Sequence, residues 1–147
     1  MGGTYRQRRW RYDRSHLMAA LPAPLEQFSR SYLRSVEDLQ VFILCVDHRE
    51  RWWDPTGVAR ALSMRESRAR RILDQFARAN LLDIRVTDEV RYRFGPGIGE
   101  LETQAVAFAS AYHHNPAEIV QFVARSTVAD SVRDFADAFR IKRRDDR

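Results

Sequence analysis

Apolar residues recur at helical spacing along most of the chain. A weak pattern predicts a short helix over 25–33, and a stronger one predicts a mostly buried helix from Ser35 to about His48. The stronger helix opens on Ser35-x-x-Asp38, a capping-box pattern with Asp in place of the usual Glu. The sequence after residue 24 is therefore expected to begin with two consecutive helices.

Two closely spaced helices are predicted next. Asp54-Pro55 is an N-cap residue followed by proline at the first helical position, so a short helix should run from there to about Leu62. Ser63-x-x-Glu66 has the form of a second capping box, which leaves no room for a long loop before the following helix. That helix should end near Asn80, which can adopt the left-handed conformation of a helix C-terminus. Its core-facing stripe consists of Ala69, Ile72, Leu73 and Phe76.

The hydrophobic period changes from helical to two in the next segment. Apolar and polar residues alternate over 82–86 and again over 90–94, with Thr87-Asp88-Glu89 between the two runs. This pattern predicts a two-stranded hairpin with one apolar face. The opposite face carries Arg85, Arg91 and Arg93.

Helical spacing returns after the sequence GPGIG at 95–99. It predicts helices over 99–113 and 116–126, the second of which begins at the cap-and-proline pair Asn115-Pro116. Phe135 and Phe139 then lie one helical turn apart near the C-terminus. The predicted fold class is mainly α with a small β-hairpin.

The order helix, short helix, tight turn, helix, hairpin resembles the winged helix–turn–helix domain of bacterial transcriptional regulators. The match lies in RWWDPTGVARAL as the first helix of the motif, SM as the turn, and RESRARRILDQFARANLL as the second helix running into a strand. Asn80 stands where such domains usually have glycine, and Gly57 where they more often have an acidic residue. The whole chain also resembles small bacterial proteins whose winged domain is followed by helices ending in a phrase like FADAFR. The resemblance implies a winged helix–turn–helix with additional C-terminal helices.

The resemblance further implies a transcriptional regulator whose second motif helix enters the major groove of double-stranded DNA by its N-terminal half. If the apolar stripe faces the core, Ser67, Arg71 and Arg78 point directly away from it. Arg68 and Gln75 then lie on one flank, and Arg70 lies on the other, near Asp74. We expect groove contacts from Ser67, Arg68 and Arg71, and phosphate contacts from the hairpin arginines. The expected DNA-binding residues are Arg65, Ser67, Arg68, Arg70, Arg71, Gln75, Arg85, Arg91 and Arg93.

The distribution of charge is typical of a protein that binds a polyanion. The net charge is +5, and residues 57–94 hold nine arginines against five acids. Residues 1–17 hold five arginines against one aspartate, and residues 140–147 hold five basic residues against two acidic ones. A local explanation for part of this charge is pairing of Arg70 with Glu66 or Asp74, although surface pairs contribute only about 0–1 kcal/mol.

We divide the chain into three parts. Residues 1–17 form a basic arm without helical or strand periodicity, and two explanations stay open: a poorly ordered binding arm, or a misassigned start ahead of Met18. Residues 18–98 form the winged helix–turn–helix domain. Residues 99–147 supply the C-terminal helices and a basic tail. The helices over 99–113 and 116–126, together with Phe135 and Phe139, are expected to form the interface of a homodimer.

Other kinds of site are disfavoured by the sequence. The single cysteine, Cys45, lies in the apolar run VFILCV, which excludes a disulfide framework and indicates a core residue in a reducing cytoplasm. The adjacent His113 and His114 point in different directions on a helix and have no second ligand pair at metal-binding spacing. GPGIG lacks the spacing of a phosphate-binding glycine loop. No apolar run approaches the roughly 20 residues of a membrane span, and neither a signal peptide, a cofactor site nor a catalytic arrangement is indicated.

One alternative function stays open. Winged helices also serve as protein–protein interaction modules that do not bind DNA. An uninterrupted positive face over residues 64–79 and the hairpin would favour DNA. Interruption of that face by Asp74, Asp83, Asp88 and Glu89 would favour a protein partner.

Overall fold

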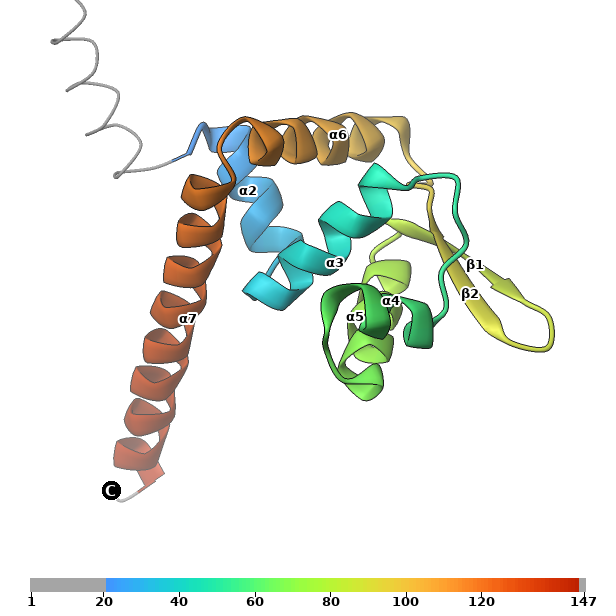
Figure 1. Cartoon of the computed structure of the whole chain (residues 1–147). Coiled ribbons are helices and arrows are strands. Elements are labelled where there is room, and N and C mark those ends of the chain that lie inside the picture. The colour runs from blue at the N-terminus through green and yellow to red at the C-terminus, as the bar shows by residue number, and fades with distance from the viewer. Residues whose placement is uncertain (1–20, 146–147) are drawn as a thin grey trace, which may run out of the picture.

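The computed structural model describes residues 21–145, and the side chains of all of these except 130, 131 and 139–145. The expectations for residues 1–17 and for the side chain of Phe139 lie outside this description. Six helices and one hairpin follow one another in it (Figure 1). They are α2 (Ala23–Tyr32), α3 (Val36–Asp47), α4 (Pro55–Leu62), α5 (Glu66–Arg78), β1 (Leu82–Val86), β2 (Val90–Phe94), α6 (Gly99–His114) and α7 (Pro116–Asp145). The predicted class, mainly α with a small hairpin and C-terminal helices, is confirmed.

Four phenylalanines join the helices into one core. Phe28 of α2 lies with its ring centroid 5.3 Å from that of Phe42 in α3 and 5.3 Å from that of Phe108 in α6. Phe42 in turn lies 6.3 Å from Phe76 of α5, edge to face. All four rings are buried, and such aromatic pairs contribute roughly 0.5–1.5 kcal/mol beyond the burial of their area. The second helix of the motif, α5, is thereby anchored to the body of the protein.

Two of the predicted helix starts are confirmed by their caps. The side chain of Ser35 accepts a hydrogen bond from the Asp38 backbone N–H at 3.0 Å, and Asp54 accepts one from the Gly57 N–H at 2.7 Å. A Cβ atom at position 57 would lie 2.8 Å from Asp54 Oδ1. Gly57 therefore leaves room for the cap of α4, which gives a physical reason for glycine at this helical position.

The predicted capping box at Ser63 is wrong. Ser63 is the C-cap of α4, with a left-handed backbone (φ 54°), and α5 begins after Arg65 without a side-chain cap. An N-cap residue needs an extended backbone, which Arg65 has and Ser63 does not. At the other end of α5 the prediction is confirmed, because Asn80 adopts the left-handed conformation (φ 64°).

The hairpin is fixed at its base and exposed toward its tip. β1 and β2 pair antiparallel from Leu82 opposite Phe94 to Val86 opposite Val90. The backbone of Trp53 exchanges hydrogen bonds with Tyr92, at 2.7 and 2.8 Å, so the segment before α4 lies alongside β2. The apolar face is buried at Leu82, Tyr92 and Phe94, whereas Ile84 is 51% and Val86 71% exposed.

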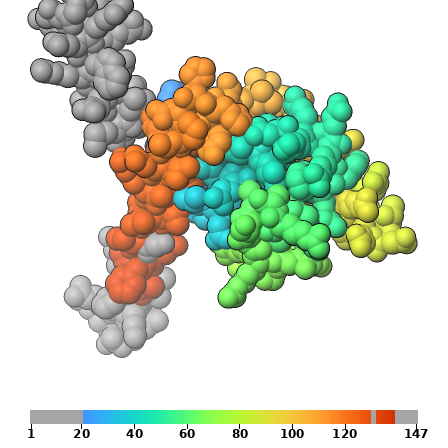
Figure 2. Space-filling view, viewed as in Figure 1, coloured from blue at the N-terminus to red at the C-terminus, as the bar shows by residue number. Residues whose placement is uncertain are grey.

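The C-terminal region differs from its prediction in length. α6 ends close to the expected residue, but α7 is one continuous helix from Pro116 to Asp145 and not a short helix over 116–126. Thr127, the first residue past the expected end, lies within this helix, and its hydroxyl is within hydrogen-bond distance of the carbonyl oxygens of both Val123 and Arg34. The part of α7 that is coloured in Figure 2 stands clear of α4 and α5 there, as the ribbon of α7 does in Figure 1. Within residues 21–145, no helix combines the length and apolarity that crossing a membrane requires.

Candidate nucleic-acid interface

The outer face of α5 is the part of the motif that packing leaves available. Its four stripe residues, Ala69 to Phe76, are buried as predicted. Ser67, Arg71 and Arg78 point the other way and are exposed. Arg65 precedes the helix and is also exposed. The helix therefore presents a hydroxyl and guanidinium groups on a rigid support.

One flank of α5 is in contact with α3. Arg68 Nη2 lies 3.4 Å from Glu37 Oε1, and Gln75 Nε2 donates to Asp38 Oδ2 at 3.4 Å. Arg68 and Gln75 therefore lie on the same flank of α5, as the helical wheel predicted. Because both side chains already bind acids of α3, they are less available to a ligand than Ser67 and Arg71.

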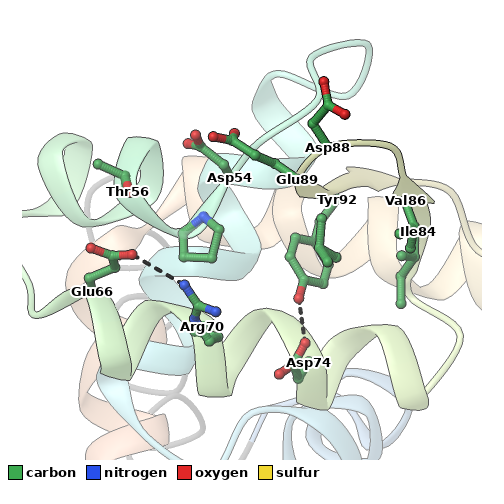
Figure 3. Close-up of a pocket in the computed structure, with 12 residues that line it drawn as sticks. Asp54, Thr56, Glu66, Arg70, Asp74, Ile84, Val86, Asp88, Glu89 and Tyr92 are labelled. Carbon is green, nitrogen blue, oxygen red and sulfur yellow. Dashed lines mark hydrogen bonds and ion pairs between the residues drawn. The ribbon is translucent and has the colours of Figure 1, made fainter.

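The other flank faces the hairpin. Arg70 pairs with Glu66, with Nη2 and Oε1 3.2 Å apart. Of the two expected partners of Arg70, Glu66 is the one with which it pairs; Asp74 instead accepts a hydrogen bond from the Tyr92 hydroxyl (Figure 3). Burial, and then the bond to Asp74, raises the pKa of Tyr92 to about 12. This bond links α5 directly to the hairpin, and the helical pattern alone could not predict it.

A cavity of about 570 Å³ lies between α4, α5 and the hairpin, and we call it the acidic groove. Ile84, Val86 and Val90 form an apolar wall on the hairpin (Figure 3). Arg70 is the one basic residue among the side chains that line this cavity. The acids that line it are Asp54, Glu66, Asp74, Asp88 and Glu89. The positive face is therefore interrupted between α5 and the hairpin, by three of the four acids named from the sequence.

A second cavity, of about 420 Å³, lies between α2 and α5, and we call it the basic groove. Its lining includes Arg34, Arg71 and Arg78 and no acidic residue. Tyr32 and Gln75 complete its polar lining together with Ser31. The two flanks of α5 thus differ in the sign of their charge.

The hairpin arginines lie on the face turned away from α5. Tyr92 points toward α5, so its neighbours Arg91 and Arg93 project to the opposite face. The ring of Trp52 lies under two guanidinium groups, with the Cζ atoms of Arg85 and Arg93 4.5 and 4.4 Å from the ring centroid. Arg91 lies opposite Arg85 in the register of the two strands. The predicted shared arginine face is confirmed, and its contact with DNA stays a prediction.

Two residues of this surface were missed in the sequence. Arg34 stands alone between two helices and carries no periodic signal, although its place directly before the cap of α3 could have indicated a solvent-facing side chain. Trp52 lies just before the cap of α4, and the alternation of the hairpin gave no sign that Arg85 and Arg93 share its aromatic ring.

Two of the remaining candidate groups, His113 and Cys45, have surroundings typical of structural residues. His113 Nε2 lies 2.7 Å from Asp47 Oδ1 at the end of α6. Cys45 is buried in the core, and burial raises the pKa of its thiol to about 12. Among the described residues, no three His, Cys, Asp or Glu side chains lie together as a metal would require.

The order of the elements is that of a winged helix–turn–helix domain followed by two helices. A MarR-family transcriptional regulator from Silicibacter pomeroyi is similar in structure, at 22% identity and a TM-score of 0.45, over 80% of this chain and 85% of that one. BpsR from Bordetella bronchiseptica, whose DNA binding is regulated by 6-hydroxynicotinic acid, is also similar, at 18% identity and a TM-score of 0.43 over 93% of both chains. No family model matches the chain, and no curated protein matches its sequence.

Proposed function

We propose that this protein is a DNA-binding transcriptional regulator of the winged helix–turn–helix type. The observation that carries the proposal is the outer face of α5, where Ser67 and Arg71 are exposed on a helix whose opposite side is fully buried. A helix fits the major groove of B-DNA, and arginine is the residue that most often reads guanine there. Both residues lie in the N-terminal half of α5, the part that enters the groove in this motif.

The proposal differs in detail from the sequence prediction. Arg71 is the strongest candidate for a base or phosphate contact, because Arg68 is engaged by Glu37. The hairpin arginines lie on the far side of the hairpin from α5, so they would meet a different part of the duplex from the helix. Loss of the Arg71 guanidinium should therefore weaken binding more than loss of the Arg68 guanidinium.

We further propose that the protein is a homodimer through its C-terminal helices. Val128, Val132 and Phe135 of α7 are 63%, 62% and 67% exposed, which is unusual for large apolar residues on one helix. Two-fold dimers are common among regulators of this motif, because two recognition helices then meet two half-sites. Analytical ultracentrifugation at micromolar concentration should give twice the mass of the chain. A monomer under these conditions would refute the dimer.

The acidic groove favours a second candidate function, binding of a basic protein partner. Five carboxylates against one guanidinium repel a phosphate backbone, and the exposed Ile84 and Val86 offer apolar contact area. In this alternative the arginines of α5 serve solubility. A regulator should bind DNA, whereas a module of the second kind should not.

The test is binding to the DNA upstream of the protein's own gene at low salt. The wild type should bind, and Arg71→Ala should bind more weakly, with a smaller dependence on salt concentration. Arg68→Ala is the matched control, because it removes the same side chain from the flank that faces α3. No binding by the wild type would refute the regulator and leave the protein-partner function.

A further inference from the structure

We infer that the basic groove between α2 and α5 binds phosphates of the DNA backbone through Arg34, Arg71 and Arg78. The inference rests on the proposed function and deepens it. It adds two contact residues outside the N-terminal half of α5, and it assigns the backbone of the duplex to the α2 side of that helix.

The charge of the groove is the first argument. Arg34, Arg71 and Arg78 are exposed and line one cavity together, and no carboxylate lines it with them. No ion pair joins any of these three side chains to a described acid, whereas several other described arginines are paired. Like charges in one cavity repel one another, and an anion between them removes that repulsion. A guanidinium group matches the geometry of a phosphate and can bind two of its oxygens at once, with two parallel hydrogen bonds.

The backbone around Arg34 is the second argument. Its N–H donates to Asp38 Oδ2 at 3.0 Å, and its carbonyl accepts a hydrogen bond from the Thr127 hydroxyl. The same Asp38 carboxylate accepts from Gln75 of α5, and Asp38 is only 4% exposed. The two walls of the groove are thus tied together below its surface. The backbone of Arg34 is fixed while its side chain stays exposed, so binding has to order the side chain but not the chain segment that carries it.

The opposite flank of α5 is the third argument. A phosphate placed between α5 and the hairpin would lie among five acidic side chains, with one guanidinium that already pairs with Glu66. Such a position is electrostatically unfavourable. Three guanidinium groups line the groove on one side of α5, and five carboxylates line the groove on the other side. The backbone of the duplex should therefore follow the side with the arginines.

The experiment is a salt titration of DNA binding, followed by fluorescence anisotropy. The slope of log K against log salt is negative, and each phosphate contact contributes about 0.9 to its magnitude. Arg34→Gln and Arg78→Gln should each reduce the magnitude of the slope by about that amount. Between about 50 and 200 mM salt, each variant should lose roughly 3- to 4-fold less affinity than the wild type loses. Arg34→Lys keeps the charge and should restore the slope. Arg133→Gln, an exposed arginine of α7, is the control with the same change in charge.

The outcomes separate the inference from the proposed function. If the wild type binds DNA and both glutamine variants keep its slope, the basic groove does not contact the backbone, and the regulator proposal stands. If the wild type does not bind at low salt, both are overturned. A second arm measures thermal unfolding in inorganic phosphate against chloride at equal ionic strength. Stabilisation by phosphate that Arg34→Gln abolishes, with an unchanged DNA slope, would assign the groove to a small anion and overturn the backbone contact.

Discussion

The bond between the Tyr92 hydroxyl and Asp74 offers a direct test of how α5 and the hairpin are held together. Tyr92 is 2% exposed and packs in the core, whereas the Asp74 carboxylate is half-buried. Tyr92→Phe removes only the hydroxyl and keeps the packing of the ring. The substitution therefore isolates one hydrogen bond to a charged acceptor.

The expected cost of this substitution follows from the surroundings of Asp74. Hydrogen bonds to charged groups contribute about 1.5–3 kcal/mol. Water can reach the half-buried carboxylate once the hydroxyl is gone, which limits the penalty to the lower end, about 1.5 kcal/mol. For a chain of this size that corresponds to a fall in melting temperature of roughly 3–6 °C.

Urea unfolding of Tyr92→Phe, Asp74→Ala and the double variant measures the coupling between the two residues. A direct bond should give a coupling energy of about 1 kcal/mol or more, so the double variant should be more stable than the sum of the single effects implies. Strictly additive effects, or a loss below about 0.5 kcal/mol for Tyr92→Phe, would show that this bond does not hold α5 to the hairpin.

Three further predictions concern the same region. Trp52→Ala should remove the support of Arg85 and Arg93, at about 0.5–1 kcal/mol per exposed cation–π contact, and accelerate amide exchange in the hairpin measured by NMR. Asp54→Ala should cost about 1 kcal/mol in chemical unfolding because α4 loses its cap. Because the pKa of Tyr92 is raised from 10.0 to about 12, its contribution to stability should be complete below pH 10 and be lost as pH rises through 12. Alkaline titration followed by tyrosinate absorbance checks this, with Tyr92→Phe lacking the late-titrating group.

The sequence was sufficient to predict the elements whose signals are local. The caps at Ser35 and Asp54, the left-handed Asn80 and the alternation over 82–94 each depend on neighbouring residues alone, and all are confirmed. Ser63 was misassigned because one residue cannot end α4 in a left-handed conformation and also cap α5. Helix α7 was predicted too short because its continuation does not rest on a core-facing stripe: the described side chains at 132–138 are all exposed.

The candidate site was only partly predictable because its charge depends on contacts between distant segments. The helical wheel placed Ser67 and Arg71 correctly, but it held no information on Glu37, which binds Arg68 from α3. The acidic groove gathers side chains from α4, α5 and the hairpin, and the basic groove joins α2 to α5. Neither can be inferred from the charge of one segment.

In the proposed complex, DNA lies against the outer face and the α2 flank of α5. The most direct measurement is NMR chemical-shift mapping of the labelled protein with the duplex from upstream of its own gene, at low salt. We expect shifts concentrated at residues 31–34 and 67–78, with smaller changes at the acids of the acidic groove. Shifts concentrated at residues 54–56 and 84–90 while α5 is unchanged, or no shifts at all, would contradict this placement of the DNA.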